Sequence, residues 1–222
     1  MSKLLLTLAI ATTTLLFSCT STEPMRSKSP NNPETKPQLR LYGGPRTRSS
    51  MVRWYLAELN LPYEYVEVNL QGGDNLKPEY LAVNPMGKLP ALSDGDFKLW
   101  ESGAILLYLA NKYHPQNPTS PEEQAKIAQW VLFANATLGP GLFLEDRREK
   151  EMPRLLKPLD DIFQKQPFLL GEEFTVADVS VGYYLYMGRL LLKLDYSGYP
   201  AVEKYLENLS SRSPFQQTVG KR

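Results

Sequence analysis

The chain has 222 residues, of which 42% are apolar and 22% charged, so a globular fold with a substantial core is expected. Its 25 basic and 24 acidic residues leave a formal net charge of +1, which argues against nucleic-acid binding because no cationic surplus is available to neutralise phosphates. The mean hydropathy of −0.34 excludes a protein with many membrane spans. A single Cys and a single His exclude a zinc site, any His-rich metal centre and a disulfide scaffold.

The first 18 residues have the pattern of a secretion signal. Lys3 provides a short positive segment, and the apolar stretch from Leu4 to Phe17 is too short to span a bilayer. The following Leu16-Phe17-Ser18-Cys19 resembles the lipobox of bacterial lipoproteins, which implies that Cys19 becomes the diacylated first residue of the mature chain. We therefore expect residues 1–18 to be removed and the protein to be exported and membrane-anchored, on the periplasmic side or elsewhere in the cell envelope. The alternatives are an ordinary cleaved signal and an uncleaved anchor, with Cys19 incidental.

Residues 19–38 join this signal to the fold. From Thr20 to Gln38 the chain is rich in Ser, Thr, Pro, Asn and Lys and shows no apolar periodicity, which predicts a disordered, semi-extended tether. Cys19 is the only cysteine of the chain. If it carries the lipid, the folded part has no thiol, and catalysis by a cysteine is excluded.

The segment 39–114 has the pattern of a small α/β domain. Strict alternation of apolar and polar residues predicts strands, and apolar residues at helical spacing predict helices. The predicted elements are strands at 39–42, 63–68, 89–92 and 97–100 and helices at 50–59 and 102–113. The order is βαβ followed by ββα, so the first two strands are predicted to be parallel.

The segment 121–215 is predicted to be helical throughout. The predicted helices are at 121–135, 150–163, 176–192 and 201–211. Thr175 and Asp178 have the spacing of a capping box, in which Thr175 is the N-cap and Asp178 the N3 residue. The helix that they start is apolar around much of its circumference, so we expect it at the centre of an all-α C-terminal domain.

Five segments, taken together, resemble the glutathione transferase family in order and spacing. They are Val52-Arg53-Trp54, Leu61-Pro62-Tyr63-Glu64, the run from Asn84 to Leu92, Glu101-Ser102-Gly103-Ala104-Ile105 and Phe174-Thr175-Val176-Ala177-Asp178. The resemblance covers about Leu39 to Phe215. It implies a thioredoxin-like N-terminal domain, glutathione as co-substrate without a metal, a small electrophile as second substrate, a role in detoxification, and a homodimer.

By this resemblance, Lys88, Leu89, Pro90, Glu101 and Ser102 bind glutathione. Leu89-Pro90 stands where the family has a cis-proline, and the backbone of Leu89 would pair with the cysteinyl backbone of glutathione like an added strand. The start of the helix at Ser102 suits the carboxylate of the γ-glutamyl group, and Glu101 suits its ammonium group. Taken singly, a plain N-cap at Ser102 and a structural turn at Pro90 are the alternatives.

The family's activating hydroxyl lies after the first strand, which here is the stretch from Gly43 to Ser50. This stretch has no Cys, which excludes the thiol chemistry of some family members. Thr47 is the first candidate for the hydroxyl that stabilises the glutathione thiolate, and Ser49 is the second. Tyr42 lies on the strand itself, where the tyrosine classes place their hydroxyl, but the loop looks more like that of the serine-type members.

Two arginines flank the candidate hydroxyl. Arg46 and Arg48 would add positive potential near the thiolate. The alternative is that Ser49 or Ser50 caps the following helix and that both arginines are solvated.

The resulting hypothesis is a membrane-tethered glutathione transferase. A non-catalytic interaction module of the same fold and a glutathione-dependent isomerase or peroxidase are the alternatives. The helical part also contains two groups of aromatic, apolar and polar residues with different expected positions. We expect Tyr183, Tyr184 and Tyr186 in the core, and Phe133, Asn135, Leu138 and Phe143 as candidate walls of an electrophile pocket.

Overall fold

The structure is a computed structural model and describes residues 38–114 and 120–220. The predicted signal, Cys19 and the predicted tether as far as residue 37 lie outside the described residues. Within the described ranges, no helix combines the length and the apolar character needed to cross a membrane.

A four-stranded sheet forms the first part of the fold, with strand order β2-β1-β3-β4. The strands are β1 (Leu39–Gly43), β2 (Glu64–Glu67), β3 (Ala91–Asp94) and β4 (Phe97–Trp100). β1 and β2 are parallel, as the βαβ pattern predicts, and β3 is antiparallel to both β1 and β4. Ala91 pairs with Tyr42 on one side and with Trp100 on the other, so the chain that enters β3 and the chain that leaves β4 are neighbours at one end of the sheet.

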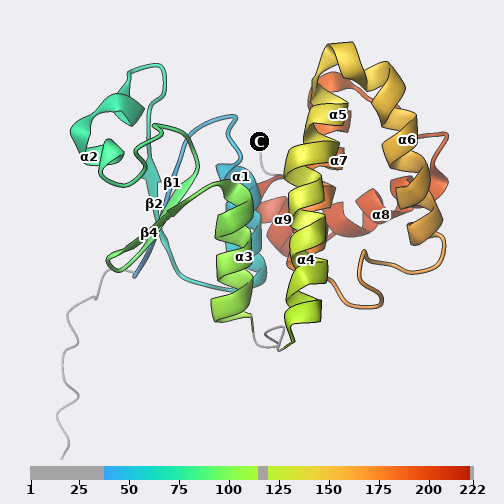
Figure 1. The fold of residues 1–222 in the computed structure, drawn as a ribbon, viewed down its shortest axis with the longest axis horizontal. Coiled ribbons are helices and arrows are strands. Elements are labelled where there is room, and N and C mark those ends of the chain that lie inside the picture. Colours follow the sequence, from blue (N-terminus) through green and yellow to red (C-terminus); the bar gives the residue numbers. More distant parts are fainter. Residues whose placement is uncertain (1–37, 115–119, 221–222) are drawn as a thin grey trace, which may run out of the picture. The chain divides into compact units, whose positions relative to one another are not determined.

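Helices lie on both faces of this sheet (Figure 1). α1 (Ser49–Glu58) and α3 (Ser102–Tyr113) pack against each other and against the sheet on the face toward the helical part. The 3-10 helix η1 (Asp74–Leu76) and α2 (Pro78–Leu81) lie on the opposite side. The period of two along β1 supports both layers, since Leu41 is buried in the main core while Tyr42 packs edge to face on Tyr80 of α2. The thioredoxin-like βαβ-ββα arrangement is therefore confirmed.

The second part of the fold is all-helical, as predicted. Its elements are α4 (Pro121–Phe133), the π-helical segment η2 (Ala134–Leu138), α5 (Gly139–Phe143), α6 (Glu145–Phe163), α7 (Val176–Leu192), α8 (Pro200–Ser210) and α9 (Ser213–Thr218). α7 contacts α1, α3, α4, α5 and α8, which is the central position that its apolar circumference predicts.

The capping box predicted for α7 is present. Thr175 Oγ1 accepts a hydrogen bond from the Ala177 amide, and Asp178 Oδ2 accepts one from the Thr175 amide at 2.9 Å. Asp178 Oδ1 also accepts hydrogen bonds from the Leu169 amide and from the Tyr205 hydroxyl. The box therefore fixes the start of α7 and ties it to two other segments of the helical part.

The predicted elements differ from the structure at several points. The third strand begins at Ala91 rather than at Leu89, and η1, α2 and α5 are not among the predicted helices. α6 begins at Glu145 rather than at Lys150, because the extended backbone of Leu144 alone separates it from α5. The charged run that begins at Arg147 therefore lies within the helix. α9 was not predicted, and it extends the helical part to Thr218, beyond the predicted boundary at residue 215.

The two parts of the fold share one core. The ring of Trp54 in α1 meets Phe215 of α9 edge to face, with centroids 4.9 Å apart. Beside it, the Arg212 guanidinium donates two hydrogen bonds, of 2.8 and 2.7 Å, to the Glu58 carboxylate at the end of α1. These contacts hold α1, which follows the loop after β1, against α9 and the residue before it.

Candidate functional site

A cavity of about 960 Å³ lies between the loop after β1 and the helical part. The loop and the start of α1 line one wall with residues 44–50 and Arg53. The opposite wall is mostly apolar and aromatic, and it includes Phe143, Leu144, Tyr183, Tyr184, Met187 and Leu191. A polar loop facing an apolar wall suits a small molecule with a reactive polar group at one end.

Thr47 and Ser49, the two predicted hydroxyls, lie together at this cavity. Thr47 Oγ1 is 2.7 Å from Ser49 Oγ and donates to the Gly44 carbonyl at 2.8 Å. Ser49 is 2% exposed, whereas Thr47 is half-buried, and both belong to the cavity lining. Thr47 is therefore the hydroxyl nearer to the open space, and Ser49 supports it from behind.

Of the alternative for this loop, in which Ser49 or Ser50 caps α1 and both arginines are solvated, only the exposure of Arg46 matches the structure. The N-cap of α1 is Arg48, and no side chain caps the helix. Ser50 Oγ instead donates to the Thr47 carbonyl and lies 3.1 Å from the Tyr183 hydroxyl. Arg48 is more than a solvated cation, because its guanidinium contacts the side chains of Asn135, Tyr184 and Glu101.

Tyr42 lies away from this cavity. Its ring packs on Tyr80 across the other face of the sheet, with centroids 6.0 Å apart, and it does not belong to the cavity lining. Thr47 and Ser49 therefore remain the candidates for the activating hydroxyl.

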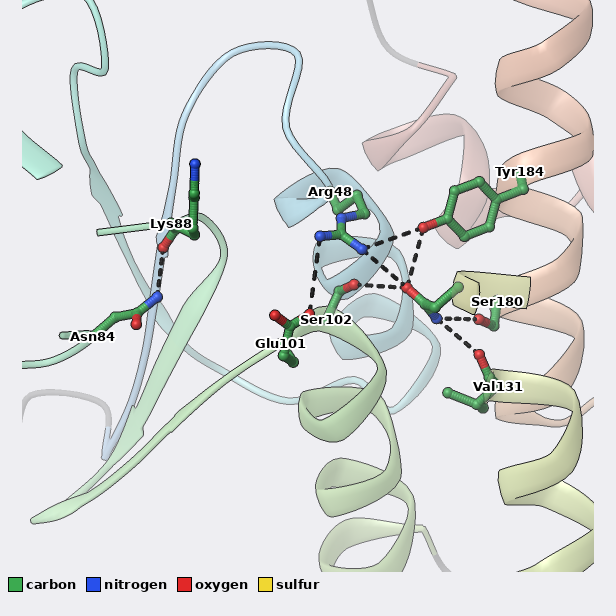
Figure 2. Close-up of polar contacts among 9 residues, drawn as sticks. Arg48, Asn84, Lys88, Glu101, Ser102, Val131, Ser180 and Tyr184 are labelled. Carbon is green, nitrogen blue, oxygen red and sulfur yellow. Dashed lines mark hydrogen bonds and ion pairs between the residues drawn. The ribbon is translucent and has the colours of Figure 1, made fainter. Parts of the chain in front are cut away.

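Lys88, Leu89 and Pro90 lie just before β3. The Leu89-Pro90 peptide bond is cis, as the resemblance implies. The Lys88 carbonyl accepts hydrogen bonds from Asn84 Nδ2 at 2.7 Å (Figure 2) and from the Tyr80 hydroxyl at 2.5 Å. Burial raises the pKa of Tyr80 to about 12, so its hydroxyl stays protonated and remains a donor. These bonds fix the backbone that precedes Leu89.

Gly44 connects the Leu89 segment to the hydroxyl loop. A Cβ built on Gly44 would lie 2.8 Å from the Val68 carbonyl oxygen and 3.3 Å from Leu89 Cδ1, with Thr47 Cγ2 at 4.0 Å. Only glycine fits this close approach. The side chains of Leu89 and Thr47 therefore both lie next to the backbone of Gly44.

Glu101 and Ser102 lie at the junction of β4 and α3, beside the Leu89 segment. Glu101 has a φ of 72°, a strained conformation for a residue with a side chain and one that is concentrated at functional sites. Its carboxylate lies 4.0 Å from the Arg48 guanidinium. Ser102 is completely buried, and its hydroxyl donates to Asn135 Oδ1 at 3.1 Å. The first backbone N–H groups of α3 have no partner within the helix and point outward from its start.

The predicted residues thus form two adjoining groups. Thr47 and Ser49 line the 960 Å³ cavity. The predicted glutathione-binding residues border it without belonging to its lining: Lys88, Leu89, Pro90, Glu101 and Ser102. Gly44 and Arg48 connect the two groups.

The aromatic and polar residues of the helical part differ partly from expectation. Tyr183 and Tyr184 are buried, as expected, but they also form the cavity wall. Of the candidate wall residues, Phe143 does line the cavity, whereas Leu138 is enclosed in the core. Phe133 and Asn135 do not belong to the cavity lining, and nothing in the sequence indicates the polar network that Asn135 centres.

That network joins the two parts of the fold (Figure 2). Asn135 Oδ1 accepts from Ser102, Arg48 and Tyr184, and its Nδ2 donates to the Val131 carbonyl and to Ser180 Oγ. No sequence signal points to Asn135, because Thr137 is another polar residue of the same segment and the partners Arg48 and Ser102 lie far away in the chain. In the described ranges, no group of three His, Cys, Asp or Glu side chains is placed to hold a metal ion.

This two-part fold, with a hydroxyl loop beside a cis-proline segment, defines the glutathione S-transferase class. The model of the glutathione S-transferase N-terminal domain matches residues 37–111, and that of the C-terminal domain matches residues 143–208. The chain belongs to the glutathione S-transferase family.

Two curated relatives and one solved structure illustrate the similarity. The disulfide-bond oxidoreductase YfcG of Escherichia coli (strain K12) is 29% identical, over 81% of this chain and 93% of that protein. Glutathione S-transferase hmp2 of Hypomyces subiculosus is 31% identical, over 78% of this chain and 94% of that protein. The glutathione transferase URE2P6 from Phanerochaete chrysosporium, solved in complex with oxidized glutathione, has a TM-score of 0.73 and 31% identity, covering 83% of this chain and 96% of that one.

Proposed function

We propose that the protein is a glutathione transferase that joins the glutathione sulfur to a small electrophile. The observation that carries this proposal is the Thr47–Ser49 hydroxyl pair at the wall of a largely apolar cavity. A thiolate placed there meets a hydroxyl donor on one side and space for an apolar substrate on the other.

The Thr47 hydroxyl would donate a hydrogen bond to the thiolate instead of to the Gly44 carbonyl. A hydrogen bond to the charged form lowers the pKa of the thiol, as do the nearby start of α1 and the cation of Arg46. The thiol proton passes to solvent. The sulfur then forms a bond to the electrophilic carbon, and the leaving group departs with its electron pair.

Glutathione would lie across the neighbouring group of residues. The Leu89 backbone would pair with its cysteinyl backbone, the N–H groups at the start of α3 would bind the γ-glutamyl carboxylate, and Glu101 would bind the ammonium group. This position is supported by the register of β3 and β4, which makes the Leu89 segment and Glu101 neighbours.

Steady-state conjugation of glutathione to chlorodinitrobenzene tests the proposal on the full chain. We expect turnover above the uncatalysed rate. In Thr47→Val, kcat should fall about tenfold or more, which corresponds to the loss of a hydrogen bond to a charged acceptor. Thr47→Ser is the matched control and should keep most of the rate. Equal rates in the wild type and Thr47→Val would overturn the assigned role of Thr47.

A glutathione-dependent disulfide reductase is a second candidate, because the similar Escherichia coli protein is named a disulfide-bond oxidoreductase. A mixed disulfide with glutathione requires a cysteine. The only cysteine of the chain is Cys19, which lies outside the described residues. Reduction would therefore have to use two glutathione molecules, one as nucleophile and one to release the product. Reduction of hydroxyethyl disulfide with no conjugation of chlorodinitrobenzene would favour this candidate.

We also propose that the protein is exported and anchored through a lipid on Cys19. The Leu16-Phe17-Ser18-Cys19 sequence supports this proposal. Metabolic labelling with a radioactive fatty acid in a bacterial host should mark the full chain and leave Cys19→Ala unmarked. Labelling of both proteins, or of neither, would contradict the anchor.

A homodimer is proposed from the family. An apolar groove between α4 and α6 supports it, with Trp130, Phe133 and Leu155 in the groove and Leu132 exposed on the same helix. Analytical ultracentrifugation of the full chain should give twice the mass of one chain. A monomer at micromolar concentration would contradict it.

A further inference from the structure

The side-chain oxygen of Asn135 has three hydrogen-bond donors around it, one more than its number of lone pairs. Its Oδ1 lies 3.1 Å from Ser102 Oγ, 3.1 Å from the Tyr184 hydroxyl oxygen and 3.3 Å from Arg48 Nη1, and all three are donors. A carboxamide oxygen has two lone pairs. The three donors therefore compete, and Arg48 has the longest of the three bonds.

The amide of Asn135 is held in one orientation. Its Nδ2 donates to the Val131 carbonyl at 2.9 Å and to Ser180 Oγ at 3.3 Å (Figure 2). Asn135 lies in the π-helical segment η2, a kind of irregularity often found at functional sites. A Cβ on Gly103 would lie 3.3 Å from Asn135 Nδ2, so the lack of a side chain there lets the start of α3 come close.

The three donors come from different places. Ser102 starts α3, where the γ-glutamyl carboxylate is proposed to bind. Arg48 and Tyr184 are in the cavity lining, where the second substrate is proposed to bind, and Arg48 Nη1 also lies 3.4 Å from the Tyr184 hydroxyl oxygen. Asn135 is thus a single acceptor shared between the two proposed substrate sites.

We propose that Asn135 is a positioning residue. Its hydrogen bond from the Arg48 guanidinium becomes stronger when the glutathione site is occupied. This inference rests on the proposed function. When a carboxylate reaches the start of α3, the Ser102 hydroxyl turns from Asn135 to the carboxylate, because a charged acceptor gives the stronger hydrogen bond. Both lone pairs of Asn135 Oδ1 are then available to Arg48 and Tyr184, and the guanidinium is fixed at the cavity wall.

Binding in the two sites is therefore coupled for a second ligand that uses the Arg48 cation. The cavity lining contains the cations Arg46, Arg48 and Arg53 and one carboxylate, that of Glu67. A ligand with an apolar body and an acidic group matches this wall. Anilinonaphthalene sulfonate, a fluorescent molecule of this kind, is a suitable probe of the cavity.

The coupling is measured by titrating the full chain with this probe, with and without saturating S-methylglutathione, which cannot react. We expect S-methylglutathione to tighten probe binding about fivefold or more, the usual lower range of coupling between two sites. The matched analogue has aminobutyryl in place of γ-glutamyl, so it keeps the ammonium group and lacks the α-carboxylate. Even at saturation it should leave probe affinity unchanged, since Ser102 then keeps its bond to Asn135.

Variants identify the residues that carry the coupling. Asn135→Ala and Arg48→Gln should each bring the coupling factor close to one, and the double variant should show no further change. Arg212→Gln is the control, because it removes a link between the two parts of the fold outside the cavity and should keep the coupling. If Asn135→Ala fails to fold, the analogue and Arg48→Gln still decide the question.

Two results would overturn the inference. The first is coupling that persists in Asn135→Ala or Arg48→Gln, and the second is equal coupling by S-methylglutathione and the aminobutyryl analogue. If S-methylglutathione does not bind the wild-type chain, the proposed function fails and the inference fails with it. Conjugation that is normal while probe coupling is absent would remove the inference alone.

Discussion

The side-chain hydroxyls of Thr47 and Ser49 lie 2.7 Å apart at the point where the loop after β1 enters α1. They are not equivalent, because Ser49 is 2% exposed while Thr47 is half-buried at the cavity. Ser49 Oγ also lies 3.5 Å from the Tyr65 hydroxyl oxygen and 3.4 Å from the Gly44 carbonyl oxygen. Ser49 is therefore placed to orient the Thr47 hydroxyl, and Thr47 is the group that we propose faces a bound thiol.

Ser49→Ala should lower the conjugation rate less than Thr47→Val does. Thr47 keeps its own proton in this variant and loses only a supporting hydrogen bond, so we expect kcat to fall by a factor of about two to ten. The measurement is steady-state kinetics with both substrates varied, and the KM for glutathione should stay within about twofold. A larger loss in Ser49→Ala than in Thr47→Val would reverse the two roles.

Ser102→Ala should weaken glutathione binding without abolishing it. The variant removes one hydroxyl contact, worth a factor of about two to ten in Kd, while the N–H groups and the dipole of α3 remain. Titration calorimetry with glutathione on the wild type and the variant measures the change. Unchanged affinity would place the γ-glutamyl carboxylate elsewhere.

Asp94 should make the fold sensitive to acid. Burial of Asp94 favours its neutral form, but hydrogen bonds from Lys112, Tyr113 and Tyr108 together outweigh this effect and hold its pKa below the usual range. The lowered pKa stabilises the fold at any pH above the pKa that this carboxyl group has in the unfolded chain. This contribution is lost as the pH falls through the lower pKa of the folded state.

We therefore expect Asp94→Asn to lower the free energy of unfolding by about 1–3 kcal/mol at pH 7 and by much less at pH 3. Urea unfolding at both pH values measures the difference. Asp96→Asn, in the exposed turn next to it, is the control and should change stability by less than about 0.5 kcal/mol at either pH. A difference between wild type and Asp94→Asn that grows toward low pH would show that the sign is wrong.

Thr175→Ala should destabilise the fold by about 1–2 kcal/mol, because it removes the cap of the central helix α7. Ser120 forms an equivalent capping box at the start of α4, where its bonds are exposed. Ser120→Ala is therefore the matched comparison, with an expected loss of about 0.5–1 kcal/mol. Thermal and urea unfolding of both variants measure the two losses. A larger loss in Ser120→Ala than in Thr175→Ala would contradict the central role of α7.

Much of the fold was predictable because its signals are local. The alternation before Gly43, the hairpin turn at Asp94 and the capping box at Thr175 each depend on residues close together in the chain. The break between α5 and α6 was not predictable, since Leu144, whose extended backbone separates the two helices, is neither glycine nor proline.

The candidate site was predictable only in part. The hydroxyls of Thr47 and Ser49 and the cis peptide before Pro90 follow short motifs. Asn135 and Tyr184 both contact Arg48, which lies 87 residues before Asn135 and 136 residues before Tyr184. A single sequence carries no signal for such pairs, because the contacts exist only after the two parts of the fold have docked.

The pKa of the glutathione thiol in the bound state tests the central claim most directly. Difference absorbance of the thiolate, followed from pH 5 to 10 on the full chain saturated with glutathione, reports this pKa. We predict a value at least about one unit below that of free glutathione in the wild type and in Thr47→Ser, and a return toward the free value in Thr47→Val. A bound thiol that titrates like free glutathione in the wild type, or identically in all three proteins, would contradict the account.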